Sequence, residues 1–299
     1  MGLLSLSPFV TGCQKSQPVP LSSQLRHHQY QNTVPGTHKL VKFRADEFGR
    51  RETFVSNPAS RRQFALFFGG SNITGFVPYD KTLPSQFGRV APQIQPYNYA
   101  YRAPGPGNLL DILRHSELEK EVTQETGVAF YFHREFMIDR VVGDSSYVSH
   151  SGDRMPWFEL EGNRLVYQGS FADAKPMTYW IRSLLDKLSR LWNVPMRLPL
   201  SKRSVDFKKM CLMVKEAETA FLRQKPKAEF FVVVDFHEHE QRNSMVEKCF
   251  RSKGLTLLSL HRPFKKNRLK YVYSTDPHYN EAGLKRLAVS LWLNWKNRI

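Results

Sequence analysis

Five short apolar runs alternate with longer amphipathic stretches along this chain of 299 residues. The first run, residues 62–68, reads Arg-Gln-Phe-Ala-Leu-Phe-Phe and stops at Gly69-Gly70. A run that is apolar on both faces is typical of a strand in a parallel sheet covered by helices on both sides. The predicted strands are 62–68, 95–101, 127–132, 228–236 and 255–260.

Amphipathic helices are predicted between and after these strands. In the stretch 205–223, Met210, Val214, Ala217 and Phe221 recur at steps of three and four residues and form one apolar stripe. Strands that alternate with helices require right-handed crossovers, so we expect a flavodoxin-like three-layer α/β/α sandwich with a mostly parallel five-stranded sheet. The other predicted helices are 108–126, 176–192, 238–253 and 281–295.

One segment interrupts the alternation. Residues 157–167 read as two short strands around a Glu161-Gly162-Asn163 turn. We expect a β-hairpin inserted after the third strand, lying over the ligand site. In such a fold that site lies at the carboxyl ends of the parallel strands.

The first residues suggest an exported protein. Val10-Thr11-Gly12-Cys13 resembles the lipobox of bacterial lipoproteins, in which the cysteine is lipidated. Residues 1–13 would then be a signal segment, 14–36 a polar linker and 37–299 the folded domain, in the periplasm or anchored to the outer membrane. No Lys or Arg precedes the apolar run, which leaves open a cytoplasmic protein with a short apolar terminus.

The remaining cysteines, Cys211 and Cys249, have neither CxxC nor Cys/His spacing. Two interpretations stay open for them: two small buried side chains or one disulfide. His237-Glu238-His239 lacks the further partners that a metal site needs, so we predict neither a metal nor a cofactor. Because His237 follows the fourth strand, it is a candidate substrate contact.

The charge balance favours polyanionic partners. The chain has 44 Lys and Arg against 27 Asp and Glu, a formal net charge of +17. A field of this sign attracts nucleic acid, anionic lipid or acidic cell-surface polymers. No nucleic-acid-binding motif is recognisable, so specific binding to nucleic acid is not expected. No stretch reaches the roughly 18–20 apolar residues of a membrane-spanning helix.

Two separate motifs carry candidate catalytic residues. Ser71 directly follows the first strand and Gly69-Gly70, which places a hydroxyl at the carboxyl edge of the sheet. Asp276-Pro277-His278 puts a carboxylate two residues before an imidazole, just ahead of the last helix. A serine hydroxyl becomes a good nucleophile when an imidazole accepts its proton and a carboxylate orients that imidazole.

Together, Gly69-Gly70-Ser71-Asn72-x-x-Gly75 and Asp276-x-His278-x-Asn280-x-x-Gly283 resemble the first and last sequence blocks of the SGNH/GDSL hydrolase superfamily. The resemblance spans residues 62–299. It implies that Ser71 is the nucleophile, His278 the general base and Asp276 the residue that orients His278.

The resemblance also implies an oxyanion hole. In the family its donors are the backbone N–H of the nucleophile, a backbone N–H in a glycine loop after the second strand, and an asparagine side chain after the third. The corresponding candidates are Ser71 itself and Ala103 or Gly105 in the glycine loop. The third strand is followed by His133-Arg134, without the asparagine. We therefore expect Asn72, His133 or Arg134 to substitute, with His133 and Arg134 as substrate contacts.

The sequence leaves several functions open. The first is a serine-dependent ester hydrolase or acyltransferase that acts on acylated cell-envelope carbohydrate or lipid. The second is a catalytically degenerate module that binds an anionic envelope polymer, and its basis is the missing asparagine together with the net charge. A third, nucleic-acid binding through charge alone, would show steep salt dependence.

Gly143-Asp144-Ser145 follows no apolar strand and is interpreted as a loop.

Overall fold

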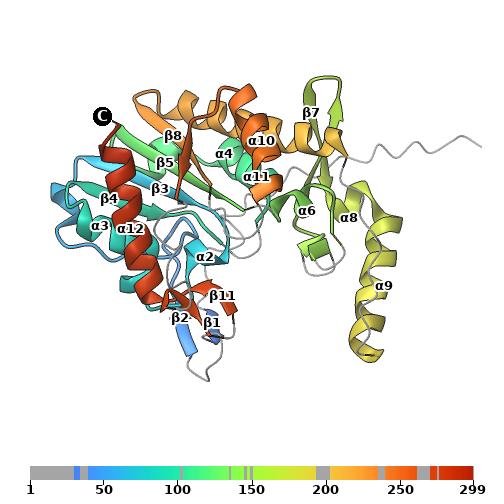
Figure 1. Cartoon of the computed structure of the whole chain (residues 1–299), viewed down its shortest axis with the longest axis horizontal. Coiled ribbons are helices and arrows are strands. Elements are labelled where there is room, and N and C mark those ends of the chain that lie inside the picture. Colours follow the sequence, from blue (N-terminus) through green and yellow to red (C-terminus); the bar gives the residue numbers. More distant parts are fainter. Residues whose placement is uncertain are drawn as a thin grey trace, which may run out of the picture.

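The computed structural model describes residues 30–33, 40–101, 104–134, 136–144, 147–148, 151–192, 203–234, 240–260, 270–274 and 276–298. A five-stranded parallel sheet in the order β4-β3-β5-β8-β9 forms the centre (Figure 1). Each predicted strand overlaps one of these five. Their bounds are Gln63–Phe68 (β3), Ile94–Asn98 (β4), Thr126–His133 (β5), Ala228–Val234 (β8) and Leu257–Ser259 (β9).

Helices cover both faces of the sheet. Alternate residues of β3 point to opposite sides, with Phe64 and Leu66 in one buried cluster and Ala65 and Phe67 in the other. The predicted flavodoxin-like three-layer sandwich is therefore confirmed. The first cluster packs under α4 (Pro106–His115), α10 (Ser204–Gln224) and α11 (Glu240–Ser252), and the second under α3 (Leu83–Val90) and α12 (Glu281–Lys296).

Two helical predictions were incomplete. The predicted helix 108–126 is two helices, α4 and α5 (Leu118–Glu121), because Ser116 adopts an extended conformation that ends α4. Helix α3 had not been predicted. It contains Pro84 and Gly88, two residue types that weaken a helical pattern in the sequence. In the structure, a Cβ on Gly88 would lie only 2.8 Å from Val55 Cγ1. Close packing against neighbouring segments therefore requires glycine at this position.

A small antiparallel pair precedes the sandwich. Strand β1 (Tyr30–Thr33) pairs with β2 (Leu40–Phe43). Strand β1 falls inside the predicted linker 14–36, so the end of that segment forms a strand. Residues 1–29, including Cys13, lie outside the described residues.

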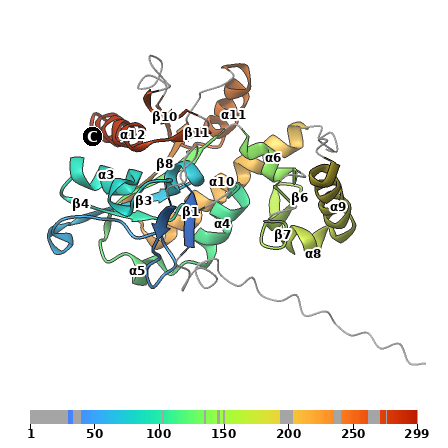
Figure 2. The same ribbon diagram turned by 90° about the horizontal axis from the view of Figure 1, so that it is seen from below.

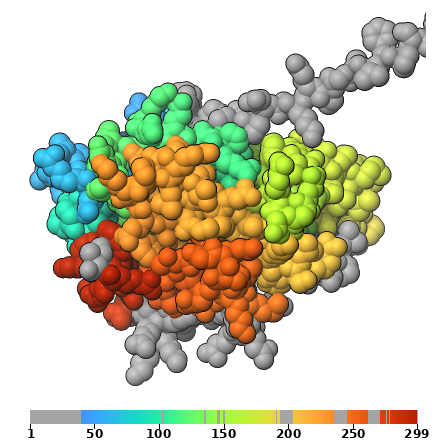
Figure 3. All heavy atoms as spheres, turned by 90° about the horizontal axis from the view of Figure 1, so that it is seen from above, coloured from blue at the N-terminus to red at the C-terminus, as the bar shows by residue number. Residues whose placement is uncertain are grey.

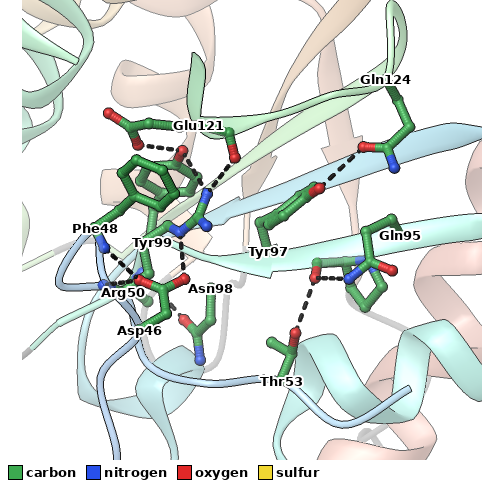
Figure 4. A network of polar contacts seen from close by, with 12 residues as sticks. Asp46, Phe48, Arg50, Thr53, Gln95, Tyr97, Asn98, Tyr99, Glu121 and Gln124 are labelled. Atoms are coloured by element: carbon green, nitrogen blue, oxygen red, sulfur yellow. Dashed lines mark hydrogen bonds and ion pairs between the residues drawn. The ribbon is translucent and has the colours of Figure 1, made fainter. Parts of the chain in front are cut away.

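A network of polar contacts fastens the segment after β2 to the edge of the sheet (Figure 4). The buried guanidinium of Arg50 donates to Asp46 Oδ2 at 2.7 Å, to the Tyr99 hydroxyl at 3.1 Å and to the Glu121 carbonyl at 2.9 Å. The Tyr99 hydroxyl in turn donates to Glu121 Oε2 at 2.7 Å. These contacts join residues from three separate segments at the end of β4.

The predicted hairpin is present. Strands β6 (Pro156–Glu161) and β7 (Arg164–Ser170) pair around Gly162, whose φ of 62° suits glycine. The hairpin contacts α4 and α8 (Phe171–Ala174). Helix α9 (Pro176–Trp192) follows and lies away from the central sheet (Figure 2). Its exposed apolar side chains are Met177, Trp180, Ile181, Leu184, Leu191 and Trp192.

Helices α10 and α11 pack together and form much of the face seen in Figure 3. Cys211 of α10 and Cys249 of α11 are joined by a disulfide, with Cα atoms 6.2 Å apart. The structure thus selects the disulfide from the two interpretations that the sequence left open. Among the helices of the described residues, none has the length and apolar character that crossing a membrane requires.

Candidate active site

Ser71 is the first residue of α2 (Ser71–Thr74), a short helix directly after β3. The chain turns at Gly69, whose φ is 156°. A Cβ at Gly69 would lie 2.9 Å from Ile73 Cγ1 and 3.1 Å from Phe132 Cβ, so glycine allows α2 to approach β5. This turn places the Ser71 hydroxyl at the carboxyl edge of the sheet, as predicted.

Asp276 and His278 lie on β11 (Asp276–Tyr279), which pairs with β10 (Val272–Tyr273). Asn280 caps α12, because its side-chain oxygen accepts from Gly283 N at 3.0 Å. The amide of Asn280 also donates to the Val272 carbonyl at 3.0 Å. This asparagine fixes the strand that carries the acid and the imidazole.

The two motifs meet, although they lie 207 positions apart in the chain. Ser71 Oγ is 2.6 Å from His278 Nε2. On the other side of the ring, His278 Nδ1 is hydrogen-bonded to Asp276 Oδ1, which also accepts from the His278 backbone N–H at 2.8 Å. The rings of Phe76 and His278 pack edge-to-face, with centroids 4.7 Å apart. Hydroxyl, imidazole and carboxylate thus form one connected chain.

Asn72 joins the two motifs. Its side-chain oxygen accepts from the backbone N–H of Tyr279, the residue after His278, at 3.1 Å. Asn72 is buried and lines the pocket beside Ser71. The sequence suggested Asn72 as an oxyanion donor, and the structure places its carbonyl oxygen in this link between the loops.

Arg51 holds the other end of α2, a contact that sequence reasoning missed. Its guanidinium donates to the carbonyls of Gly75 at 2.6 Å and Val77 at 2.5 Å, and also to that of Thr74. The ring of Phe43 stacks on it at 3.9 Å. No local pattern around Arg51 indicates this position, because its partners follow it by more than twenty residues.

A pocket open to solvent is lined in part by Ser71, and the empty space in it and in its open mouth together is about 390 Å³. One part of its wall is formed by residues 70–73 and Tyr279. Phe132 and residues at the end of β5 and in α6 (Met137–Val141) supply the rest, including Arg134 and Arg140. No hairpin residue is among those lining the pocket, so the expectation that the hairpin covers the site was wrong.

The prediction that His133 contacts substrate was also wrong. Its side chain is buried in the core, 5.0 Å from the ring of Phe250, and does not line the pocket. Successive residues of a strand point to opposite faces, so Phe132 reaches the pocket and His133 does not. Burial, with a smaller contribution from the charge of Arg140, lowers the pKa of His133 to about 3. The ring is therefore neutral near pH 7.

Arg134 lines the pocket, where the sequence prediction placed it, and Arg140 was not predicted. The guanidinium of Arg140 donates to the Pro104 carbonyl in the loop after β4. It also packs on the rings of Phe136 at 4.9 Å and Tyr147 at 5.1 Å. The helical position of Arg140, six residues beyond Arg134, gives no sign in the sequence that it faces the same pocket.

Gly105 does not supply a free backbone donor. Its N–H donates to Asn108 Oδ1 at 2.8 Å within the cap of α4. The prediction that Gly105 contributes to an oxyanion hole is therefore wrong, since its N–H is already bonded. Ala103, the other candidate in this loop, and His237, a candidate substrate contact, lie outside the described residues. In the described part of the chain, no group of three or more His, Cys, Asp or Glu could hold a metal ion.

Comparison with known proteins gives structural likenesses only. No protein-family model matches the chain, and no curated protein sequence does. Among solved structures, an acetyl xylan esterase, Est2A, from the rumen bacterium Butyrivibrio proteoclasticus is 8% identical with a TM-score of 0.44; the match covers 80% of this chain and 64% of that one. The chain thus spans less than two thirds of the length of Est2A.

Two further structures resemble the chain over 80% of its length. One is a carbohydrate esterase, 9% identical with a TM-score of 0.42 and 69% of its own chain covered. The other is a protein described as a GDSL-like lipase from Bacteroides ovatus, 10% identical with a TM-score of 0.39 and 99% of its chain covered. At such low identities and TM-scores, these structures give no information about the chemistry of this chain. That chemistry has to be inferred from the geometry of its own residues.

Proposed function

We propose that the protein is a serine-dependent ester hydrolase or acyltransferase that acts through Ser71, His278 and Asp276. The observation that carries the proposal is the 2.6 Å separation of Ser71 Oγ from His278 Nε2. The other nitrogen of the same ring, Nδ1, is hydrogen-bonded to Asp276. This separation is within the range expected for a nucleophile and its general base.

In the proposed reaction, Ser71 Oγ attacks the acyl carbonyl carbon while His278 Nε2 takes the hydroxyl proton. The tetrahedral intermediate collapses as the ester C–O bond breaks, and His278 gives the proton to the leaving alcohol. Water, or the hydroxyl of an acceptor, then attacks the carbonyl carbon of the acyl-serine while His278 Nε2 takes its proton. The second tetrahedral intermediate collapses as the bond from Ser71 Oγ to the acyl carbon breaks, and His278 gives that proton to Ser71 Oγ. Asp276 stabilises the imidazolium that forms in both halves.

Oxyanion stabilisation is proposed for three donors. The Ser71 N–H is at the start of α2, where N–H groups have no acceptor within the helix. The Asn72 amide and the Ala103 N–H are the other candidates. Because the family asparagine is absent after β5, these donors replace a contact whose loss elsewhere costs about 2.7–4 kcal/mol in the transition state.

We further propose an exported enzyme that acts on acylated cell-envelope carbohydrate or lipid, with Cys13 as a lipidated anchor. The Cys211–Cys249 disulfide supports export, because disulfides persist mainly in oxidising compartments. The net charge of +17 supports an enzyme that acts near an anionic envelope polymer or membrane surface, to which it would be attracted.

Covalent labelling tests the catalytic proposal. A fluorophosphonate should modify wild-type protein at Ser71 and leave Ser71→Ala unmodified, with peptide mass spectrometry locating the adduct. Ser252→Ala, which removes an exposed serine on α11, is the matched control and should label normally. Wild-type protein that is neither labelled nor active on short acyl esters would contradict the proposal.

The second candidate is a module that binds an anionic envelope polymer without turning it over. The absence of the asparagine after β5 favours it, together with the net charge. Such a module should bind the polymer equally well as wild type and as Ser71→Ala, and should resist the fluorophosphonate. Labelling at Ser71 would rule it out.

A further inference from the structure

Among the described residues, the lining of the pocket beside Ser71 includes two arginines and no carboxylate. Arg134 and Arg140 share this wall with the apolar side chains of Phe132, Phe136 and Met137. A cleft with apolar walls and charge of one sign raises the local concentration of ligands of the opposite sign. The lining is therefore suited to a substrate that carries negative charge close to its ester.

The charge of Arg140 is largely buried. The contacts found for its guanidinium within the described residues are the bond to the Pro104 carbonyl and the packing on the rings of Phe136 and Tyr147. Burial lowers the pKa of Arg140, against the opposing influence of Tyr147, Tyr131, Tyr101 and Asp139. An arginine nevertheless stays protonated in proteins. A partly buried positive charge is further compensated when an anion enters the pocket.

Arg140 also has unused hydrogen-bonding capacity. Only its bond from Nη1 to the Pro104 carbonyl is found within the described residues. The remaining N–H groups of the planar guanidinium can donate to two oxygens of a carboxylate, sulfate or phosphate. The hydroxyl of Tyr101, within electrostatic reach of Arg140, likewise has no hydrogen-bond partner among the described residues.

We infer that Arg140, with Arg134, recognises an anionic group on the acyl-ester substrate: a carboxylate, sulfate or phosphate adjacent to the ester that Ser71 attacks. This inference rests on the proposed function and narrows it to a substrate class. In this arrangement Arg140 binds and orients the substrate, while Ser71, His278 and Asp276 carry out the chemistry.

A purely structural interpretation of Arg140 makes a different prediction. If its bond to Pro104 only supported the loop after β4, losing the guanidinium would affect every ester to the same extent. If it recognises an anion, its removal should lower kcat/KM for charged esters, mainly by raising KM, and leave kcat/KM for neutral esters unchanged.

A matched pair of esters distinguishes these interpretations. 3-Acetoxybenzoate carries a carboxylate at neutral pH, and 3-acetoxybenzamide has the same shape without the charge. Wild-type protein should prefer the benzoate in kcat/KM by about tenfold or more, as a charged hydrogen bond implies. Arg140→Gln should remove this preference, and Arg140→Lys, which keeps the charge without the fork, should retain part of it.

Lys227→Gln is the control for net charge. Lys227 is exposed at the start of β8, at the opposite edge of the sheet from Ser71, and pairs with Glu125. This variant should keep the wild-type preference. Equal kcat/KM for the two esters in wild-type protein, or an equal loss on both esters in Arg140→Gln, would overturn the inference.

Binding of inorganic sulfate separates this inference from the proposed function. Calorimetry at constant ionic strength should show sulfate binding to wild-type protein and to Lys227→Gln, weakened about tenfold or more in Arg140→Gln. If no ester is hydrolysed but sulfate binding depends on Arg140, the catalytic proposal fails and the anion site stands. If sulfate does not bind wild-type protein, the anion site fails even where esters are cleaved. Equal kcat/KM for the two esters in wild-type protein, or no sulfate binding to it, would overturn the inference even if Arg140→Gln does not fold, and Arg140→Lys then provides the test that Arg140 is responsible.

Discussion

Three consecutive residues at the end of β5 have three different surroundings. Phe132 lines the pocket beside Ser71, His133 is buried against Phe250 on the other face, and Arg134 returns to the pocket just past the strand. The alternation of side chains along a strand produces this pattern. Proximity in sequence to the end of a strand is therefore not enough to place a side chain in a site.

The burial of His133 predicts a pH dependence of stability. The unfolded chain binds a proton on this ring below about pH 6.5. The folded chain does so only near its pKa of about 3. The free energy of unfolding should therefore fall, by roughly 1.4 kcal/mol per pH unit, as the pH drops below 6.5.

His133→Leu should remove this contribution without breaking a hydrogen bond, because neither ring nitrogen has a partner among the described residues. Urea unfolding at about pH 7.5 and about pH 5 measures the effect, and the variant should lose less stability on acidification than wild type. An unchanged pH dependence in the variant would mean that His133 is not the buried neutral group described above.

At the scale of elements, the nucleophile depends on a short helix that cannot hold itself in place. Helix α2 has only four residues, and isolated helices of that length are unstable. Asn72 ties it to β11 at one end. Arg51, whose backbone bridges to Asn98, ties its carbonyl end to the segment before β3.

Arg51→Met should therefore slow the reaction of Ser71. The carbonyls of Thr74, Gly75 and Val77 would lose their donor, and α2 would shift relative to His278. A displacement of about 1 Å can cost about 100-fold in rate. The rate of fluorophosphonate labelling measures the effect. The control is Arg89→Met, which removes an exposed arginine on α3 that pairs with Asp80. Labelling at the wild-type rate would show that α2 does not need Arg51.

At the scale of the whole molecule, two influences act separately. The fold brings Ser71, after β3 of the central sheet, and His278, on the separate pair β10–β11, together from distant parts of the chain. The net charge of +17 acts through the field of the entire surface. The anion pocket at Arg140 is local, whereas attraction to a polyanion sums over many residues.

Binding to a sulfated polysaccharide should consequently weaken steeply with salt. We expect a loss of roughly tenfold or more between about 50 and 200 mM salt. Arg140→Gln should follow nearly the same curve as wild type, because it removes one of 44 basic residues. Retention on an immobilised sulfated polysaccharide at graded salt measures this. Complete loss of retention in Arg140→Gln would assign polyanion binding to the pocket instead.

The sequence by itself determined the five strands of the central sheet, their alternation with most of the long helices, the hairpin and the two motifs that carry Ser71, Asp276 and His278. Apolar periodicity and glycine turns are local, so they can be recognised without the fold. Only the tertiary structure decided that Arg51 and Arg140 adjoin the site, that Asn72 links its two loops, that His133 points away from it, and that Cys211 bonds to Cys249. These contacts join distant segments, and the packing of helices on the sheet fixes which side chains meet.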